Sequence, residues 1–131
     1  MEVIKIPYKE TNHFSKLVLD YLANDPKLKS FINDFPSLDS FSTQITQKSF
    51  QNIDRIALHK VLKNQNLNPS KETLKNIDTI KDENTFSITT GHQLCLFTGP
   101  LYLIYKIAST INLVETLKVK FPENNFIPIF W

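Results

Sequence analysis

The chain has 131 residues, enough for one domain that buries about two-thirds of the surface of the unfolded chain. Hydrophobic residues make up 41% and charged residues 21%, a balance typical of a globular protein and not of a disordered tail. The net charge is only +2 and Arg55 is the sole arginine, which argues against nucleic-acid binding because phosphate and base recognition depend on the arginine fork.

The single cysteine, Cys95, excludes an internal disulfide framework and a zinc site built from several cysteines, and no metal ion is expected. The N-terminus lacks the basic segment and apolar core of a signal peptide. No apolar run reaches the roughly 18 residues that a membrane span requires. We expect a soluble, cytoplasmic protein with neither a membrane nor a nucleic-acid partner.

Residues 1–84 are expected to be mainly helical. A short edge strand over residues 1–7, stopped by Pro7, precedes the helices. The helices share apolar side chains spaced three and four residues apart. In chain order they are a helix capped by residues 11–13 and ended by Asp25-Pro26, a helical turn over residues 31–36, a helix that starts after Ser37 or Asp39, a helix over residues 53–65, and a helix from Ser70 with Leu74, Ile77 and Ile80 on its apolar face.

The pattern changes near residue 84. Residues 86–90 are β-branched and alternating, which predicts a strand. A loop over residues 91–99, a helix and a turn over residues 121–125 follow. Residues 126–131 are then expected to form an apolar strand of the buried parallel kind.

The helix between these strands should begin with Pro100, which suits the first helical position, and should run to about residue 118. One of its sides is formed by four apolar residues, expected to face the core: Ile104, Ile107, Ile111 and Val114. Strand, loop, helix and strand form a βαβ unit with a right-handed crossover. Since two parallel strands do not make a stable sheet, we expect the chain to be the front part of a longer protein.

Both glycines of the chain, Gly91 and Gly99, lie in the predicted loop, which indicates unusual backbone geometry or a close backbone approach. Ligands of open α/β sheets bind beyond the carboxyl ends of parallel strands, where such loops gather. The start of the following helix presents N–H groups that attract anions. The candidate residues for binding a phosphate, a carboxylate or the edge of a nucleotide are Gly91, His92, Gln93, Thr98, Gly99, Tyr102 and Lys106.

Other interpretations of the loop stay open. The glycine spacing matches neither G-x-G-x-x-G nor G-x-x-x-x-G-K-[ST], so the loop could be structural, with Leu94, Leu96 and Phe97 filling the core. His92 could act as a general acid or base, since an imidazole exchanges protons near neutral pH, or could serve only as a hydrogen-bonding residue. Cys95 is expected to be a small buried apolar side chain and not a nucleophile.

The residues around the loop resemble a known family. Thr90-Gly91-His92-Gln93, Leu96-Phe97-Thr98-Gly99-Pro100-Leu101-Tyr102 and Tyr105-Lys106 are similar to a T-G-[QH]-Q-x-x-L-F-T-G-P-L-Y-x-x-Y-K stretch of the bacillithiol-biosynthesis cysteine-adding enzymes, also called cysteine ligases. Ile127-Pro128-Ile129-Phe130-Trp131 resembles the next strand of that family.

This resemblance implies an α/β protein of several hundred residues. Residues 1–84 would be its helical N-terminal region, and residues 85–131 would start a nucleotide-binding Rossmann-like core. Connecting domains and a C-terminal coiled coil, through which the protein could form a homodimer, would follow. The implied reaction joins cysteine to glucosaminyl-malate in the last step of bacillithiol synthesis, with ATP activating the cysteine carboxylate. His92 is the catalytic candidate. The residues that match the loop of the family are Gly91, His92, Gln93, Thr98, Gly99 and Tyr102.

Cys95 departs from the pattern of the family, so its thiol is treated as incidental. Family members continue after the tryptophan with an acidic-histidine run resembling E-D-H-D, and we therefore expect these 131 residues alone to be inactive. Two alternatives remain: an unrelated nucleotidyl-transfer enzyme or ligase with the same loop geometry, and a non-catalytic nucleotide- or anion-binding or helical interaction module.

Overall fold

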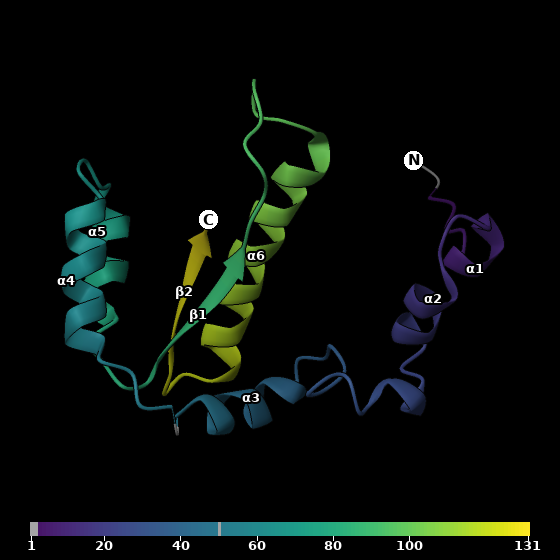
Figure 1. Ribbon diagram of the computed structural model, residues 1–131, viewed down its shortest axis with the longest axis horizontal. Coiled ribbons are helices and arrows are strands. Elements are labelled where there is room, and N and C mark those ends of the chain that lie inside the picture. Colours follow the sequence, from purple (N-terminus) through teal and green to yellow (C-terminus); the bar gives the residue numbers. More distant parts are fainter. Residues whose placement is uncertain (1–2, 50) are drawn as a thin grey trace. The chain divides into compact units, whose positions relative to one another are not determined.

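The structure is a computed structural model that describes residues 3–49 and 51–131 (Figure 1). In chain order the elements are α1 (Tyr8–Thr11), α2 (Lys16–Leu22), the 3-10 helix η1 (Pro26–Leu28), α3 (Ser40–Ser49), α4 (Arg55–Gln65), α5 (Lys71–Thr79), β1 (Thr85–Thr90), α6 (Leu101–Lys120) and β2 (Asn125–Phe130). The chain divides into two compact units, residues 1–44 and residues 45–131. The second unit contains both strands and the predicted loop.

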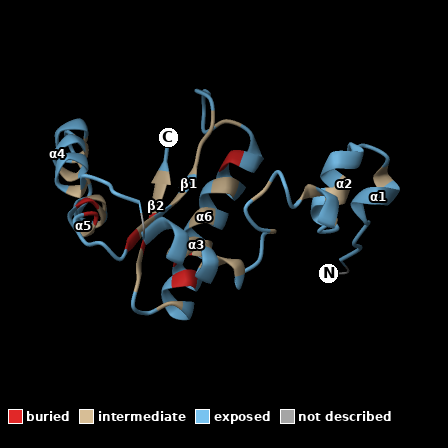
Figure 2. Ribbon diagram, turned by 60° about the horizontal axis from the view of Figure 1, so that its bottom comes forward, coloured by how far each residue is buried: buried red, intermediate tan, exposed pale blue. Residues whose placement is uncertain are grey.

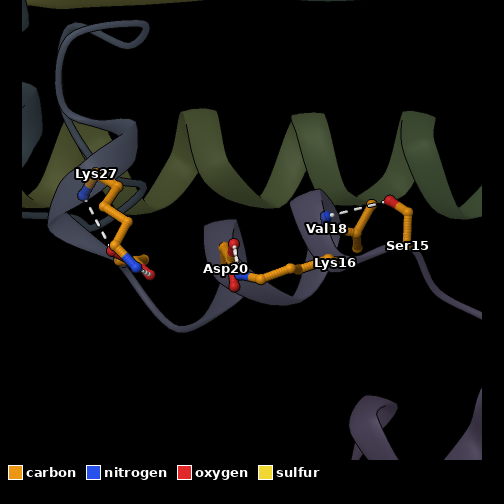
Figure 3. Close-up of polar contacts among 6 residues, drawn as sticks. Ser15, Lys16, Val18, Asp20 and Lys27 are labelled. Atoms are coloured by element: carbon orange, nitrogen blue, oxygen red, sulfur yellow. Dashed lines mark hydrogen bonds and ion pairs between the residues drawn. The ribbon is translucent and has the colours of Figure 1, made fainter.

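Local polar contacts hold the first unit (Figure 3). The Ser15 hydroxyl caps α2 by accepting from the Val18 N–H at 3.4 Å. Across the first turn of this helix, Lys16 and Asp20 form an ion pair of 2.5 Å. The Asp25 carboxylate in turn accepts from the Lys27 N–H at 3.0 Å and caps η1. None of the described residues of this unit is buried, so these caps and pairs organise it without an apolar core.

Three predictions for this unit are wrong. Residues 3–7 form no strand, and residues 1 and 2 lie outside the described part. The predicted cap at residues 11–13 is replaced by Ser15, because Asn12 takes a left-handed conformation (φ 55°) that ends α1 first. Residues 31–36 form turns and bends, and the single helical turn lies just before them, at Pro26–Leu28.

The predictions for α3, α4 and α5 are confirmed, and α4 and α5 each begin with a capping side chain. Helix α3 begins at Ser40. The Asp54 carboxylate caps α4 by accepting from the Ala57 N–H at 2.9 Å. The Ser70 hydroxyl caps α5 by accepting from the N–H three residues on, at 3.1 Å. Ile77 and Ile80 are buried as expected, whereas Leu74 stays partly exposed.

The sole arginine of the chain ties α4 to the start of the sheet. Arg55 Nη1 donates to the Ile80 carbonyl at 3.0 Å and to the Thr85 carbonyl at 3.2 Å, and Nη2 donates to the Glu83 carbonyl at 3.2 Å. One guanidinium therefore satisfies carbonyl groups at the end of α5, in the connection and at the first residue of β1. Arg55 thus has a structural role in this domain.

Strands β1 and β2 pair in parallel, with Thr85 opposite Asn125 and Thr90 opposite Phe130, and α6 packs along both strands (Figure 1). The predicted βαβ unit with two parallel strands is confirmed. The core is made of apolar side chains from α5, α6 and β2 (Figure 2). They are Ile77, Ile80, Leu103, Val114, Leu117, Phe126 and Ile127.

The predicted core face of α6 is mostly wrong. Leu103, Val114 and Leu117 are buried, whereas the three predicted isoleucines at 104, 107 and 111 are 37–50% exposed. The helix carries two neighbouring apolar stripes, and periodicity alone cannot decide which of them meets the sheet. Pro100 is extended (φ −71°, ψ 153°) and occupies the N-cap position without a capping side chain, one position before its predicted place.

Replacing Arg55 with lysine should destabilise the second unit, because a lysine keeps the charge but lacks the planar fork that reaches three carbonyl groups. We expect Arg55→Lys to lower the free energy of unfolding by about 1–2 kcal/mol. Urea denaturation followed by circular dichroism measures this loss. Lys60→Gln, at an exposed position of the same helix, is the control, and an equal loss in both variants would contradict the structural role of Arg55.

A second link between α4 and α5 should make stability depend on pH. His59 Nε2 donates to Asp78 Oδ1 at 2.9 Å, and this hydrogen bond lowers the pKa of the Asp78 carboxyl. Because the folded-state pKa lies below the unfolded one, the stabilisation is complete above an unfolded aspartate pKa of about 4 and is lost as the pH falls through the folded-state value. The stability difference between wild type and Asp78→Asn should therefore shrink between about pH 5 and pH 2. A difference that stays constant over this range in urea denaturation would contradict the assignment.

Candidate functional site

The predicted loop leaves the sheet at the edge where both parallel strands end. The parallel pairing continues one residue beyond β2, because the Trp131 N–H donates to the Thr90 carbonyl at 3.2 Å. The His92 N–H then donates to the Trp131 carbonyl at 3.3 Å. These two bonds fix the start of the loop against the end of the second strand.

Gly91 is required by this close approach. A Cβ atom at position 91 would lie 2.8 Å from the carbonyl oxygen of Trp131 and 3.0 Å from Cε2 of its indole ring. On the other side, Lys106 reaches back from α6, and its Nζ donates to the Gly91 carbonyl. The prediction of a close backbone approach at this glycine is confirmed.

His92 is held at both ring nitrogens. Its Nε2 lies 2.6 Å from the Tyr102 hydroxyl, and its Nδ1 lies 2.7 Å from the carbonyl oxygen of Gln93. The rings of His92 and Tyr102 also lie close together, with centroids 5.1 Å apart and planes tilted by 53°. The structure therefore brings together four of the predicted site residues, Gly91, His92, Tyr102 and Lys106. Gln93 joins them through its backbone, and its side chain is exposed.

The other two candidates, Thr98 and Gly99, shape the turn into α6. Phe97, Thr98 and Gly99 all have positive φ angles, of 50°, 66° and 64°, a conformation that glycine alone adopts without a steric cost. The Thr98 hydroxyl donates to the Phe97 carbonyl at 2.5 Å, and the Gly99 N–H donates to the Leu96 carbonyl at 3.0 Å. The polar contact of the Thr98 side chain is thus local, at the opposite end of the loop from His92.

The hypothesis that loop side chains fill the core is wrong. Leu94 and Phe97 are fully exposed and Leu96 is nearly so. Cys95 is exposed as well, so it is not the small buried side chain that the sequence predicts. None of the described residues covers these side chains.

Trp131 is the site residue that the sequence analysis missed. Its backbone holds His92 and its indole ring lies against Gly91. A signal was present, because two parallel strands end at the same edge, which places the end of residues 126–131 beside the start of the loop.

The arrangement offers three kinds of chemistry. His92 and Tyr102 present a hydrogen-bonded imidazole and phenol, Lys106 supplies an ammonium group, and α6 begins without a capping side chain. Among residues 3–49 and 51–131, no three His, Cys, Asp or Glu side chains gather closely enough to hold a metal ion. No helix of this part of the chain has the length and apolar character of a membrane span.

A parallel βαβ unit with a long loop at its carboxyl edge is typical of a Rossmann-like domain. Comparison with known families agrees, because residues 1–131 match the family described as "Bacillithiol biosynthesis BshC, N-terminal Rossmann-like domain". The chain belongs to this family.

Similar proteins from several bacteria carry the name "Putative cysteine ligase BshC". The chain is 51% identical over 130 residues to the protein of Christiangramia forsetii. The aligned region covers 96% of this chain and 24% of that protein. It is 51% identical to the protein of Flavobacterium johnsoniae, over 96% of this chain and 25% of that protein. It is 44% identical to the protein of Cytophaga hutchinsonii, over 98% of this chain and 25% of that protein. The chain thus spans about a quarter of the length of these relatives.

Replacing Gly91 with alanine should disrupt the loop, because the new methyl group would meet the backbone oxygen of Trp131. We expect a loss of about 1–3 kcal/mol, typical of overpacking, together with a changed emission of Trp131, the only tryptophan. Urea denaturation followed by fluorescence measures both. An unchanged emission maximum and unchanged stability would contradict the close approach.

Proposed function

We propose that a protein carrying this domain is a cysteine ligase that joins cysteine to glucosaminyl-malate in the last step of bacillithiol synthesis, using ATP to activate the cysteine carboxylate. One observation carries the proposal: a chain of the BshC family places a hydrogen-bonded His92–Tyr102 pair at the carboxyl edge of its parallel strands. Ligands of open α/β sheets bind at this edge. The proposed location is the cytoplasm, and the proposed partners are small molecules, with a homodimer formed through a coiled coil elsewhere in the protein.

The residues of the site divide into two roles in this proposal. Gly91, Trp131 and Lys106 fix the loop, because they lock its first peptide group between the strand end and the helix. His92 and Tyr102 face the reacting groups and can exchange or position a proton. Gln93 adds an exposed amide that can hydrogen-bond to substrate.

The start of α6 suits the phosphates of ATP. Pro100 makes no side-chain cap, so the first N–H groups of the helix are not bonded to a capping side chain and can donate hydrogen bonds to an anion. Lys106 can assist, because an ammonium group has three N–H donors and the Gly91 carbonyl takes one. ATP bound there would supply the activated carboxyl group of cysteine.

Alanine at His92 or Gln93 in the complete protein should lower turnover and leave the fold intact. We expect His92→Ala to reduce kcat by about 10²-fold, as for loss of a general acid or base, and Gln93→Ala to reduce it less. Melting temperatures should fall by only a few degrees, because Gln93 is exposed and His92→Ala removes two hydrogen bonds from a half-buried ring without opening the core. An assay with cysteine, glucosaminyl-malate and ATP measures turnover.

His13→Ala, an exposed histidine of the first unit, is the matched control and should be as active as wild type. Normal specific activity of His92→Ala together with a large loss of stability would show that the loop is structural. Absence of product with the wild-type protein would favour a non-catalytic nucleotide- or anion-binding module.

A further inference from the structure

The neighbours of His92 determine which of its ring nitrogens carries hydrogen. Nδ1 lies 2.7 Å from the Gln93 carbonyl oxygen, and a carbonyl can only accept a hydrogen bond. Nδ1 must therefore be an N–H donor. In the neutral ring this leaves Nε2 without hydrogen, so Nε2 is an acceptor.

The Tyr102 hydroxyl completes this assignment. It lies 2.6 Å from Nε2, and in the neutral pair it donates its hydrogen to that nitrogen. The other neutral tautomer would bring the bare Nδ1 lone pair against the carbonyl lone pairs, which is repulsive. With its hydrogen directed to His92, the Tyr102 oxygen keeps lone pairs that can accept from a ligand, and the Tyr102 residue is 55% exposed.

We infer that His92 and Tyr102 form an acceptor pair for a hydrogen-bond donor of the substrate, an amine or a hydroxyl group, and do not bind its anionic groups. The neutral His92 ring has no N–H left for a phosphate or a carboxylate, because its one N–H is bonded to the Gln93 carbonyl. Tyr102 contacts the donor, and His92 acts through Tyr102, because its Nε2 accepts the Tyr102 hydrogen and can take up a proton by that route. That the donor is the amine of glucosaminyl-malate is an assignment that rests on the proposed function.

The tautomer can be tested without any ligase activity. Long-range ¹H–¹⁵N NMR of the protein labelled with [¹⁵N]histidine separates the two neutral tautomers, and the signal that His92→Gln removes is assigned to His92. At alkaline pH we expect His92 to carry its hydrogen on Nδ1. Tyr102→Phe should keep that tautomer, because the Gln93 carbonyl remains, and should shift the Nε2 resonance. Hydrogen on Nε2 in the wild type would overturn the inference.

Steady-state kinetics test the class of the bound group. Tyr102→Phe should raise the KM for glucosaminyl-malate about tenfold, as for loss of one hydrogen bond, and should leave the KM for ATP within about twofold. Tyr105→Phe makes the same change one turn along α6 and should leave both values unchanged. A raised KM for ATP with an unchanged KM for glucosaminyl-malate would overturn the inference.

Failure of the proposed function gives a different result. If the wild type makes no product, the protein is titrated with glucosamine and, separately, with inorganic phosphate, while the His92 Nε2 resonance is followed. A shift with glucosamine that Tyr102→Phe abolishes supports the acceptor pair without the ligase assignment. A shift with phosphate alone, or with neither probe, overturns it.

Discussion

The parallel pairing of β1 with β2 is the interaction on which the rest of the second unit depends. It carries the end of β2 to the start of the loop, so that the Trp131 carbonyl holds the His92 N–H and the indole ring lies against Gly91. A side chain at residue 91 would force these groups apart. Gly91 therefore allows the ends of the two strands to approach closely. This close approach in turn fixes the position of His92.

Cations hold β1 at both ends by bonding to backbone carbonyls. Arg55 donates to the Thr85 carbonyl where the strand begins, and Lys106 donates to the Gly91 carbonyl just after it ends. Charged donors make stronger hydrogen bonds than neutral ones, and here they fix backbone that lies beside turns. The sole arginine of the chain is thus used for structure. If this site binds an anion, as proposed, the donors must come from the start of α6 and from the remaining N–H groups of the Lys106 ammonium group.

Local signals predicted the elements of the second unit well. The cap at Ser70, the β-branched run of residues 86–90 and the two-glycine loop each identify structure through contacts within a few residues. Predictions that depend on a distant surface did worse. Packing against the sheet decides which apolar stripe of α6 is buried, and the spacing of apolar residues around Ile107 does not indicate which stripe that is. The site residues were found by their place in the loop, but Trp131 joins them only through strand pairing.

The two ends of the loop differ in chemistry, so the loop is more than an anion-binding site. At the Gly99 end, the uncapped helix presents N–H donors, which suit phosphate or carboxylate groups. At the other end, the Gln93 carbonyl consumes the one N–H of the neutral His92 ring, so the ring and Tyr102 can only accept from a ligand. In the proposed function, ATP would present its phosphates at the Gly99 end and glucosaminyl-malate its amine at the His92 end. The opposite polarity of the two ends would then discriminate between these groups, since exchanging them would set donor against donor and acceptor against acceptor.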